Sequence, residues 1–452
     1  MDTNLLARYS QPGPRYTSYP PAPHFTPAVN EASWREELSQ GSGRDLSLYF
    51  HLPFCDSLCY YCGCHMIATQ KYSKASRYLD SIMREVDRVA ELVPPGRKVR
   101  QMHWGGGTPT FLNPDDIRRL AAHARARFDF AADAEAAVEV DPRGLTACHI
   151  DALREAGFNR ASLGVQDLDE KVQQAVNRIQ PFDLIEEVDA GFRAAGIDAI
   201  NIDLMLGLPH QTPGSFAYTV ERILALKPHR LAVFSYAHVP WLKKHQRLID
   251  EAALPDFPTR LELQNLTFRM LGAAGYEYIG LDHFALADDE LVIARKEGRL
   301  GRNFQGYTPL RDIDILGFGI SAISQTESVY AQNLKGLPEY QLRVDNGRLA
   351  TERGYRLSGE ERMRRDLIMT LMCDLGLDMA AFGAKWKLDF GTAFAAELAR
   401  LAPLQDDGLV RVAGERIVVT DRGRVFLRNI AMAFDATLHG AAQSGPRYSK
   451  TA

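Results

Sequence analysis

The chain of 452 residues lacks any run of about 18 apolar residues, the length that a membrane-spanning helix needs. Its first residues, MDTNLLARYSQPGPRYTSYPPAP, lack the apolar core of a signal peptide. It also lacks an excess of basic residues: 53 Lys and Arg against 57 Asp and Glu give a formal net charge of -4. Without a global basic field, nucleic acid is not an expected partner. These absences predict a cytoplasmic protein with no membrane span.

Cysteine is scarce but unevenly placed, with four of the six residues inside HLPFCDSLCYYCGCHM (51–66). This distribution does not resemble the disulfide framework of a secreted protein, and it favours a metal site in a reducing cytosol. The spacing is Cys55-x3-Cys59-x2-Cys62, followed by Cys64. Three thiolates at this spacing suit a four-iron cluster wrapped by one loop, with one iron left open. A tetrahedral zinc site is the alternative, although four ligands this close together would be sterically tight. Cys148 and Cys373 lie in predicted helices and are expected to be buried.

Short apolar strands alternate with amphipathic helices through the first half of the chain, which predicts a parallel sheet. The helices include 74–92, 113–128 and 182–196, and Asn113 and Pro114 have the residue types of a helix start. Six such units predict a partial (β/α)6 barrel, whose chemistry would sit at the C-terminal ends of the strands. The cysteine loop directly follows the first strand and would lie on that face. The expected strands are 46–51, 99–104, 136–140, 161–165, 199–205 and 231–236.

The ends of the chain have different patterns. Residues 1–45 are rich in proline and weakly periodic, which predicts an extended N-terminal arm around one helix at 29–39. The barrel is expected over 46–350. From Ser358, which forms a predicted capping box with Glu361, three helices, a hairpin and a last helix follow. The segment 351–452 therefore reads as a mostly helical, winged-helix-like domain.

Many further motifs resemble one enzyme family. The cysteine spacing and WGGGTPT (104–110) resemble the radical S-adenosylmethionine (SAM) superfamily, in which the open iron binds the methionine part of SAM. The whole set, in its order along the chain, resembles the oxygen-independent coproporphyrinogen III oxidases. The matching motifs are QPGPRYTSYP (11–20), YFHLPFC (49–55), CYYCGC (59–64), HWGGGTPT (103–110), VEVDPR (138–143), SLGVQD (162–167), NRIQ (177–180), NIDLMLGLP (201–209), FSYAHVP (234–240), RNFQGYT (302–308) and LGFGISAIS (316–324).

This resemblance implies roles for individual residues. The family commonly has Phe where this chain has Tyr61, whose additional hydroxyl needs a partner if it is buried. Taken alone, Arg178 and Asp203 could simply pair with each other. The implied cluster ligands are Cys55, Cys59 and Cys62; Tyr49 and His51 are implied in catalysis; Tyr49, Gly106, Glu139 and Ile323 are implied contacts of a first SAM; and Tyr61, Gly107, Thr108, Gln166, Arg178, Asp203 and Ala237 are implied contacts of a second SAM.

The implied reaction is the oxidative decarboxylation of two propionates of coproporphyrinogen III to vinyl groups, giving protoporphyrinogen IX in haem biosynthesis. The implied cofactors are a [4Fe-4S] cluster and two SAM molecules. A 5′-deoxyadenosyl radical from SAM would remove hydrogen from each propionate. A one-electron reductant such as flavodoxin or ferredoxin is the implied partner of a monomeric enzyme. Arg15, Arg302 and Arg447 are candidates for binding the propionates, and ordinary exposed arginines are the alternative.

Three other functions are compatible with parts of the sequence. A haem chaperone would share the fold, but the relatives of this family that deliver haem look shorter at the N-terminus than this chain and usually lack the fourth cysteine. A radical SAM methyltransferase could also use two SAM molecules, and would release S-adenosylhomocysteine. An iron–sulfur protein that binds DNA is suggested only by the C-terminal pattern, and its binding would weaken steeply with salt.

Overall fold

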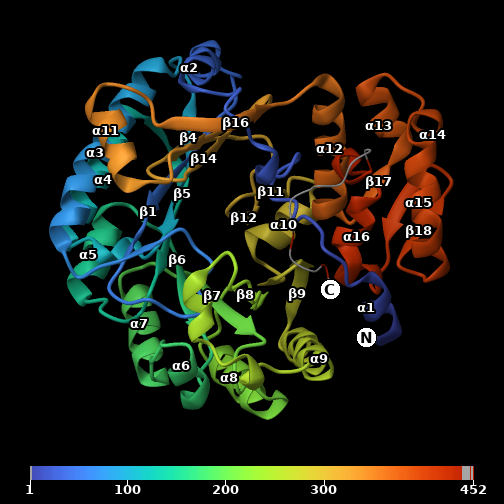
Figure 1. Cartoon of the computed structure of the whole chain (residues 1–452), viewed down its shortest axis with the longest axis horizontal. Helices are drawn as coiled ribbons and strands as arrows, with labels where there is room; N and C mark the ends of the chain where they lie inside the picture. The colour runs from blue at the N-terminus through green and yellow to red at the C-terminus, as the bar shows by residue number, and fades with distance from the viewer. Residues whose placement is uncertain (1–2, 440–447, 449–450, 452) are drawn as a thin grey trace. The chain divides into compact units, whose positions relative to one another are not determined.

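All six strands expected from the sequence are present in the computed structural model, which describes residues 3–439, 448 and 451 (Figure 1). Each pairs in parallel with the next, in the order β1-β4-β5-β6-β7-β8. Alternating burial along β7 shows one face toward the core. The bounds are β1 (Leu46–Leu52), β4 (Lys98–Gly106), β5 (Asp129–Val140), β6 (Arg160–Gln166), β7 (Ala199–Leu206) and β8 (Arg230–Ser235).

Helices follow these strands and lie along the outside of the sheet (Figure 1). The expected helix start at Asn113 is confirmed, because its side chain accepts a hydrogen bond from the Asp116 amide at 2.8 Å and Pro114 is the first helical residue. The helices around this sheet are α2 (Glu31–Gln40), α3 (Tyr72–Leu92), α4 (Pro114–Arg127), α5 (Ala147–Glu155), α6 (Glu170–Ala175), α7 (Phe182–Ala194), α8 (Pro213–Ala225), α9 (Phe257–Ala273) and α11 (Leu337–Asp345), with the short turns η2 (Pro109–Phe111), η3 (Lys244–Leu248) and η4 (Glu251–Ala253).

The sheet continues beyond β1 through strands that the sequence pattern did not predict. β13 pairs in parallel with β1, and β14 and β15 follow in antiparallel fashion. The buried Glu85 of α3 holds this extension, since it accepts hydrogen bonds from the Gly319 amide (2.8 Å), Asn333 Nδ2 (2.7 Å) and Tyr340 Oη (2.6 Å). The added strands are β13 (Asp314–Phe318), β14 (Ile323–Gln325), β15 (Val329–Asn333) and β16 (Thr351–Arg356); the cysteine loop carries the small parallel pair β2 (Phe54–Cys55) and β3 (Ile67–Ala68).

The C-terminal segment has the expected order of helices followed by a hairpin, and Ser358 and Glu361 form the expected capping box. A short strand, β17, adds to the hairpin and makes it a three-stranded antiparallel sheet. The elements are α12 (Gly359–Asp374), β17 (Gly376–Asp378), α13 (Met379–Trp386), α14 (Phe390–Ala393), α15 (Ala395–Asp406), β18 (Val410–Ala413), β19 (Arg416–Val419), η5 (Gly423–Phe426), α16 (Leu427–Met432) and η6 (Ala436–Leu438).

The described residues group into two compact units that interleave in sequence. We call Thr26–Ala274 with Asp312–Gly354 the barrel unit, and Met1–Phe25 with Gly275–Arg311 and Tyr355–Ala452 the terminal unit. The three-part division at residues 45 and 350 follows sequence pattern alone and stays a prediction. The remaining elements of the terminal unit are α1 (Thr3–Tyr9), η1 (Ala22–His24), β9 (Tyr276–Gly280), β10 (His283–Leu286), α10 (Glu290–Lys296), β11 (Gly301–Asn303) and β12 (Gly306–Thr308).

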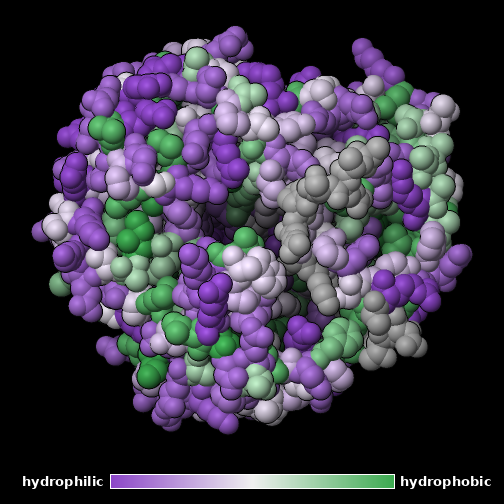
Figure 2. All heavy atoms as spheres, in the orientation of Figure 1, coloured by the Kyte–Doolittle hydropathy of each residue, from purple (hydrophilic) through white to green (hydrophobic). Residues whose placement is uncertain are grey.

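Large apolar side chains fill the space between the sheet and its helices. Phe50, Trp104 and Phe318 on adjacent strands are fully buried. Hydrophilic residues cover most of the face shown in Figure 2, and hydrophobic residues there form small separate groups. Across the described ranges, no helix combines the length and the apolar character needed to cross a membrane.

Candidate active site

The three predicted cluster ligands lie on one loop that starts where β1 ends. Backbone hydrogen bonds fix the beginning and the end of this loop, from Ile67 to the Pro53 carbonyl (2.7 Å) and from Thr69 to the Cys55 carbonyl (2.9 Å). Cys55, Cys59 and Cys62 are all free thiols, as are the other three cysteines. The loop therefore presents three unpaired sulfur ligands at the C-terminal end of a barrel strand, the position that the barrel pattern predicts for chemistry.

The donor set of this loop fits an iron–sulfur cluster. Within the described ranges, no three His, Cys, Asp or Glu side chains surround a single point where one metal ion could sit. A four-iron cluster instead takes one thiolate on each ligated iron, so its cysteines need not converge on one point. The Cys62 thiol hydrogen bonds to Cys64, which lowers the pKa of Cys62 to about 6 and favours the thiolate that iron binds.

Two arginines and a carboxylate surround the Cys59 thiol. The Arg143 and Arg178 guanidinium groups lie 3.3 and 3.5 Å from Cys59 Sγ. Both also donate to Asp141, at 2.7 and 3.0 Å. Burial raises the pKa of Asp141, but the two guanidinium groups outweigh burial and lower it below its usual range. The two guanidinium groups place positive charge beside Cys59, and Asp141 holds that charge in place.

The three glycines at the end of β4 allow close packing beside the loop. A Cβ on Gly106, whose φ is +115°, would lie 2.7 Å from the His51 ring. A Cβ on Gly105 would lie 2.7 Å from the Glu139 carboxylate, and one on Gly107 would lie 2.6 Å from the Phe54 carbonyl oxygen. Any side chain here would displace the cysteine loop or a predicted site residue, so the triple glycine is a packing requirement.

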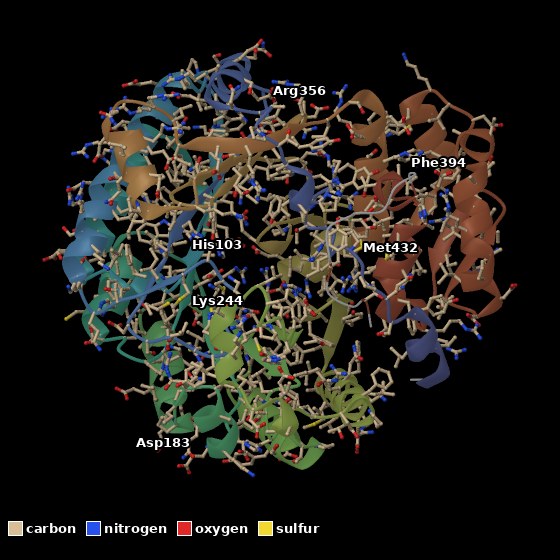
Figure 3. The ribbon with its side chains drawn as sticks, in the orientation of Figure 1. His103, Asp183, Lys244, Arg356, Phe394 and Met432 are labelled. Carbon is tan, nitrogen blue, oxygen red and sulfur yellow. The ribbon has the colours of Figure 1, made fainter. Side chains whose placement is uncertain are left out.

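Glu139, at the end of β5, presents an ionised carboxylate beside these glycines. It accepts hydrogen bonds from the His103 ring (3.1 Å; His103 is labelled in Figure 3) and from the Gly106 amide (3.1 Å). Burial opposes ionisation, but these donors lower the pKa of Glu139 below its usual range. Its side chain keeps 43% of its surface exposed, so a ligand can reach the carboxylate.

Tyr49 and His51 on β1 form a hydrogen-bonded pair. Tyr49 Oη lies 3.0 Å from His51 Nδ1, and His51 Nε2 lies 2.8 Å from the His65 carbonyl oxygen. Burial lowers the pKa of His51 to about 4 and raises that of Tyr49 well above its usual value. Both groups are therefore neutral at physiological pH, and the Tyr49 ring stacks on His103 with centroids 5.9 Å apart.

Asp203 and Arg178 do not pair with each other. Arg178 binds Asp141, whereas Asp203 accepts from Asn201 Nδ2 (2.8 Å) and Ser162 Oγ (3.2 Å). Burial raises the pKa of Asp203 to about 6. The pairing considered from the sequence is thus wrong, and among the described residues the half-buried Asp203 makes no salt bridge.

Two polar atoms near Asp203 lack partners. Arg178 Nε and Gln166 Oε1 are buried and make no hydrogen bond within the part of the chain that the structure describes. Gln166 also has a φ of +71°, in the left-handed region that residues other than glycine rarely adopt. Buried polar atoms of proteins normally have partners, so these two atoms fit a site for a polar ligand.

The other predicted contacts occupy neighbouring strand ends. Thr108 Oγ1 lies 3.0 Å from Thr110 Oγ1 and accepts from the Asp141 amide at 3.1 Å, which links the glycine loop to β5. Gly107 donates its amide to the Leu52 carbonyl at 2.9 Å. Ile323 opens β14, in the part of the sheet beyond β1. The structure brings these residues onto the barrel unit, although they come from segments far apart in the sequence.

Sequence reasoning missed the segment that covers the cysteine loop. Lys243 Nζ donates to the Cys64 carbonyl (2.8 Å), and the His245 ring lies 2.7 Å from the Cys62 carbonyl. Gln246 Nε2 donates to the carbonyls of Tyr61 (3.0 Å) and Ala237 (3.3 Å). Lys244, labelled in Figure 3, marks this segment. No local motif indicates these contacts, because the acceptors are backbone carbonyls that any donor could reach.

The two cysteines outside the loop differ. Cys373 is 1% exposed, as expected of a small hydrophobic residue in a helix. The expectation of burial is wrong for Cys148, which is exposed on α5.

Of the arginines considered for the propionates, Arg302 is 7% exposed, so the alternative of an ordinary exposed arginine is wrong for it. Arg15 is half-buried, and Arg447 lies outside the described residues.

Comparison with known proteins identifies the family of the chain. The radical SAM superfamily model matches residues 49–223, and the HemN C-terminal domain model matches residues 357–426. The chain is 46% identical over 442 residues to the oxygen-independent coproporphyrinogen III oxidase of Escherichia coli K12, covering 98% of this chain and 96% of the relative. It is 41% identical over 456 residues to the same-named protein of Helicobacter pylori 26695, covering 100% of this chain and 99% of the relative.

A solved structure gives the same result for the fold. The Escherichia coli coproporphyrinogen III oxidase, described as a radical SAM enzyme, has a TM-score of 0.92 with this chain at 45% identity. That match covers 96% of this chain and 99% of the solved one. The resemblance inferred from the motifs is confirmed: the chain belongs to the family of oxygen-independent coproporphyrinogen III oxidases, within the radical SAM superfamily.

Proposed function

We propose that this enzyme decarboxylates two propionates of coproporphyrinogen III to vinyl groups without oxygen, giving protoporphyrinogen IX for haem biosynthesis. The observation that carries the proposal is the loop of three free thiols at the end of β1, packed against the glycines of β4 and near the ionised Glu139. Family membership supports the substrate, since its relatives are named for that activity.

Cys55, Cys59 and Cys62 would hold a [4Fe-4S] cluster, and the residues around the triple glycine would hold SAM. When bound, this cluster and SAM supply one-electron chemistry that removes hydrogen from an unactivated C–H bond. The chain's own contribution is to bind and orient these groups and to exclude competing reactants. Arg143 and Arg178 keep positive charge next to Cys59.

Glu139 is proposed to bind the first SAM together with Gly106, Tyr49 and Ile323. Its carboxylate is ionised and accessible, and its negative charge favours the sulfonium and amino groups of SAM. His51 would orient Tyr49 through the contact between Tyr49 Oη and His51 Nδ1, with its ring neutral at physiological pH. These assignments give each neutral or charged group a role that matches its protonation state.

A second SAM is proposed beside the first, in contact with the remaining polar residues. Among the described residues, Arg178 Nε and Gln166 Oε1 have no hydrogen-bond partner, and Asp203 is a half-buried carboxylate without a salt bridge. These three groups offer one donor and two acceptors to a polar ligand. The same site would include Tyr61, Gly107, Thr108 and Ala237. We also propose that the enzyme acts as a monomer and receives electrons from a flavodoxin or a ferredoxin.

An anaerobic assay of the reconstituted protein tests the function. Dithionite, SAM and coproporphyrinogen III are supplied, and porphyrins and nucleosides are measured by mass spectrometry. Protoporphyrinogen IX with 5′-deoxyadenosine is the expected result. The Cys55→Ala variant should form neither product, whereas Cys148→Ala, the same change at an exposed thiol outside the loop, should form both.

Three other outcomes would contradict the proposal in different ways. Cleavage of SAM without a vinyl product would leave the radical chemistry and remove the substrate. Tight haem binding without decarboxylation would assign the chain to haem delivery instead. Release of S-adenosylhomocysteine would indicate methyl transfer.

A further inference from the structure

The His103 side chain of the barrel unit joins two residues that are proposed to bind the first SAM. It comes from β4, which lies between β1 and β5 in the sheet. Tyr49 of β1 is its direct partner in the strand register on one side, and Ala137 of β5 is its partner on the other. Glu139 follows Ala137 by two residues, so Tyr49, His103 and Glu139 point to the same face of the sheet.

This face is accessible, whereas the opposite face of the same strands is covered. Met102 and Trp104, the neighbours of His103 along β4, are fully buried, and so is Val138 before Glu139. The side chains of His103 and Glu139 keep 18% and 43% of their surface exposed. His103 therefore lies on the side of the strands where a ligand can bind, not in the packed core.

A hydrogen bond from His103 fixes one oxygen of the Glu139 carboxylate. His103 Nε2 lies 3.1 Å from Glu139 Oε1, and an ionised carboxylate only accepts, so Nε2 carries the proton and donates. The Gly106 amide donates to the other oxygen, Oε2, at 3.1 Å. Burial opposes ionisation, and the bond from His103 is the largest of the contributions that lower the pKa of Glu139. Held at both oxygens, the carboxylate keeps about two of its four acceptor sites for a ligand.

The ring of Tyr49 in turn orients the His103 ring. The two rings stack with centroids 5.9 Å apart and an angle of 23° between their planes. Tyr49 is itself held by the contact of its Oη with His51 Nδ1 at 3.0 Å. His51, Tyr49, His103 and Glu139 thus form a continuous line of contacts across three adjacent strands.

We infer that His103 is a positioning residue, which holds the Glu139 carboxylate toward the first SAM. An unrestrained glutamate side chain populates several rotamers, and fixing one of them in advance removes that entropic cost from ligand binding. His103 acts through Glu139 and needs no contact of its own with SAM. This inference rests on the proposed function, in which Glu139 binds the first SAM. A packing role would require the ring of His103 but not its Nε2 donor, so the two roles can be separated.

SAM binding to the reconstituted full-length protein tests the inference by equilibrium dialysis with radiolabelled SAM. Reductant is omitted so that SAM is not cleaved. His103→Phe keeps an aromatic ring against Tyr49 but removes the donor, and it should raise the Kd about 10-fold. His103→Gln carries an amide nitrogen that reaches the position of Nε2, so its Kd should stay within about 3-fold of the wild type. An unchanged Kd in His103→Phe, or an equal rise in both variants, would overturn the inference.

His123→Phe is the matched control. His123 lies on α4 of the same unit, is 24% exposed and also contacts a carboxylate, with its Nε2 atom 2.9 Å from Asp87 Oδ1. This variant should keep the wild-type Kd for SAM. Iron analysis of every variant checks that the compared proteins carry equal amounts of the cluster.

A double-mutant cycle with Glu139→Gln shows whether His103 acts through the carboxylate. Where dialysis resolves two classes of SAM site, the class that weakens in Glu139→Gln is compared. Adding His103→Phe to Glu139→Gln should raise the Kd by less than about 2-fold more. A further 10-fold rise would make His103 independent of Glu139 and overturn the inference, as would an unchanged Kd in Glu139→Gln itself.

Asparagine provides a second variant if His103→Phe does not fold. Its amide reaches only the position of Nδ1 and loses Glu139, so His103→Asn should raise the Kd for SAM about 10-fold. An unchanged Kd in that variant would overturn the inference.

The catalytic assay distinguishes failure of this inference from failure of the proposed function. A wild type that forms protoporphyrinogen IX while His103→Phe keeps the wild-type Kd for SAM would overturn the inference alone. A wild type whose SAM binding depends on His103 as expected, but which forms no vinyl product, would overturn the function alone.

Discussion

The hydrogen-bond partners of His51 determine which of its ring nitrogens carries the proton. His51 Nε2 lies 2.8 Å from the His65 carbonyl oxygen, which can only accept, so Nε2 must donate. The neutral ring has one proton, and Nδ1 must therefore accept from Tyr49 Oη at 3.0 Å. Glutamine can replace this histidine with little change, because its terminal nitrogen reaches the position of Nε2. Asparagine reaches only the position of Nδ1 and should lose the contact with His65.

The buried position of His51 makes its contribution to stability depend on pH. Its pKa is lowered to about 4, so the folded state favours the neutral ring. The stabilisation is present above the ordinary pKa of about 6.5 and is lost as the pH falls toward the folded value. Between pH 7.5 and pH 5.5 the wild type should lose about 1.4 kcal/mol through this residue. For a unit of this size that corresponds to roughly 3–5 °C in melting temperature.

Calorimetry of the wild type and of His51→Gln across this pH range measures the effect. The melting-temperature difference between the two proteins should shift by roughly 3–5 °C in favour of the variant on acidification. His439→Gln, at an exposed histidine of the terminal unit, should keep a constant difference from the wild type. A constant difference for His51→Gln too would refute the neutral, buried assignment. Retention of the His65 contact by His51→Asn but not by His51→Gln would refute the choice of nitrogen.

Three further predictions concern other parts of the barrel unit. Iron analysis after anaerobic reconstitution should show that Cys59→Ala loses the cluster and activity, whereas Cys64→Ala keeps its iron; equal loss in both would contradict a three-cysteine site. Asp141→Asn leaves Arg178 without its carboxylate and should destabilise the protein by about 3 kcal/mol. The melting temperature should fall accordingly, and an unchanged melting temperature would count against the pairing of Asp141 with Arg178. Burial raises the pKa of Glu85 to about 7. Raising the pH from 4.5 to 7 should therefore destabilise the wild type by about 3 kcal/mol relative to Glu85→Gln, because the buried carboxyl group ionises. Melting curves of the two proteins measure this difference in stability, and a difference that does not change with pH would disprove the prediction.

Strands and helices with a clear period could be predicted from the sequence, because each is stabilised mainly by one buried face. The alternation along Ala199–Leu206 matches its alternating burial. The strand β13 has no such signal, since all five of its residues are buried and no amphipathic helix precedes it. Its pairing with β1 joins Leu46 to Asp314, a separation that no local window spans. The sequence therefore predicted the local elements, but it did not predict the strands that extend the sheet beyond β1.

The candidate site shows the same division between single residues and their partners. The cysteine spacing and the triple glycine are local motifs, and both can be recognised in the sequence. Asp141 was part of the quoted motif VEVDPR, but nothing in that motif shows that it holds Arg178. Pairing Arg178 with Asp203 was equally compatible with the sequence and is wrong. Complementary charges identify possible partners, and only the fold selects among them.

The irregular cysteine loop shows why its fixed geometry could not be read from its own residues. A loop without regular structure has carbonyls that need donors, and buried ones must find them elsewhere in the chain. Here the donors are His245 for Cys62 and Gln246 for Tyr61, from a segment more than 180 positions later for these two contacts. Any lysine, histidine or glutamine could satisfy such carbonyls, so the sequence carries no specific mark of the contact. The proposed ligands of the cluster are thus indicated by a short motif, whereas their placement depends on a distant segment that has none.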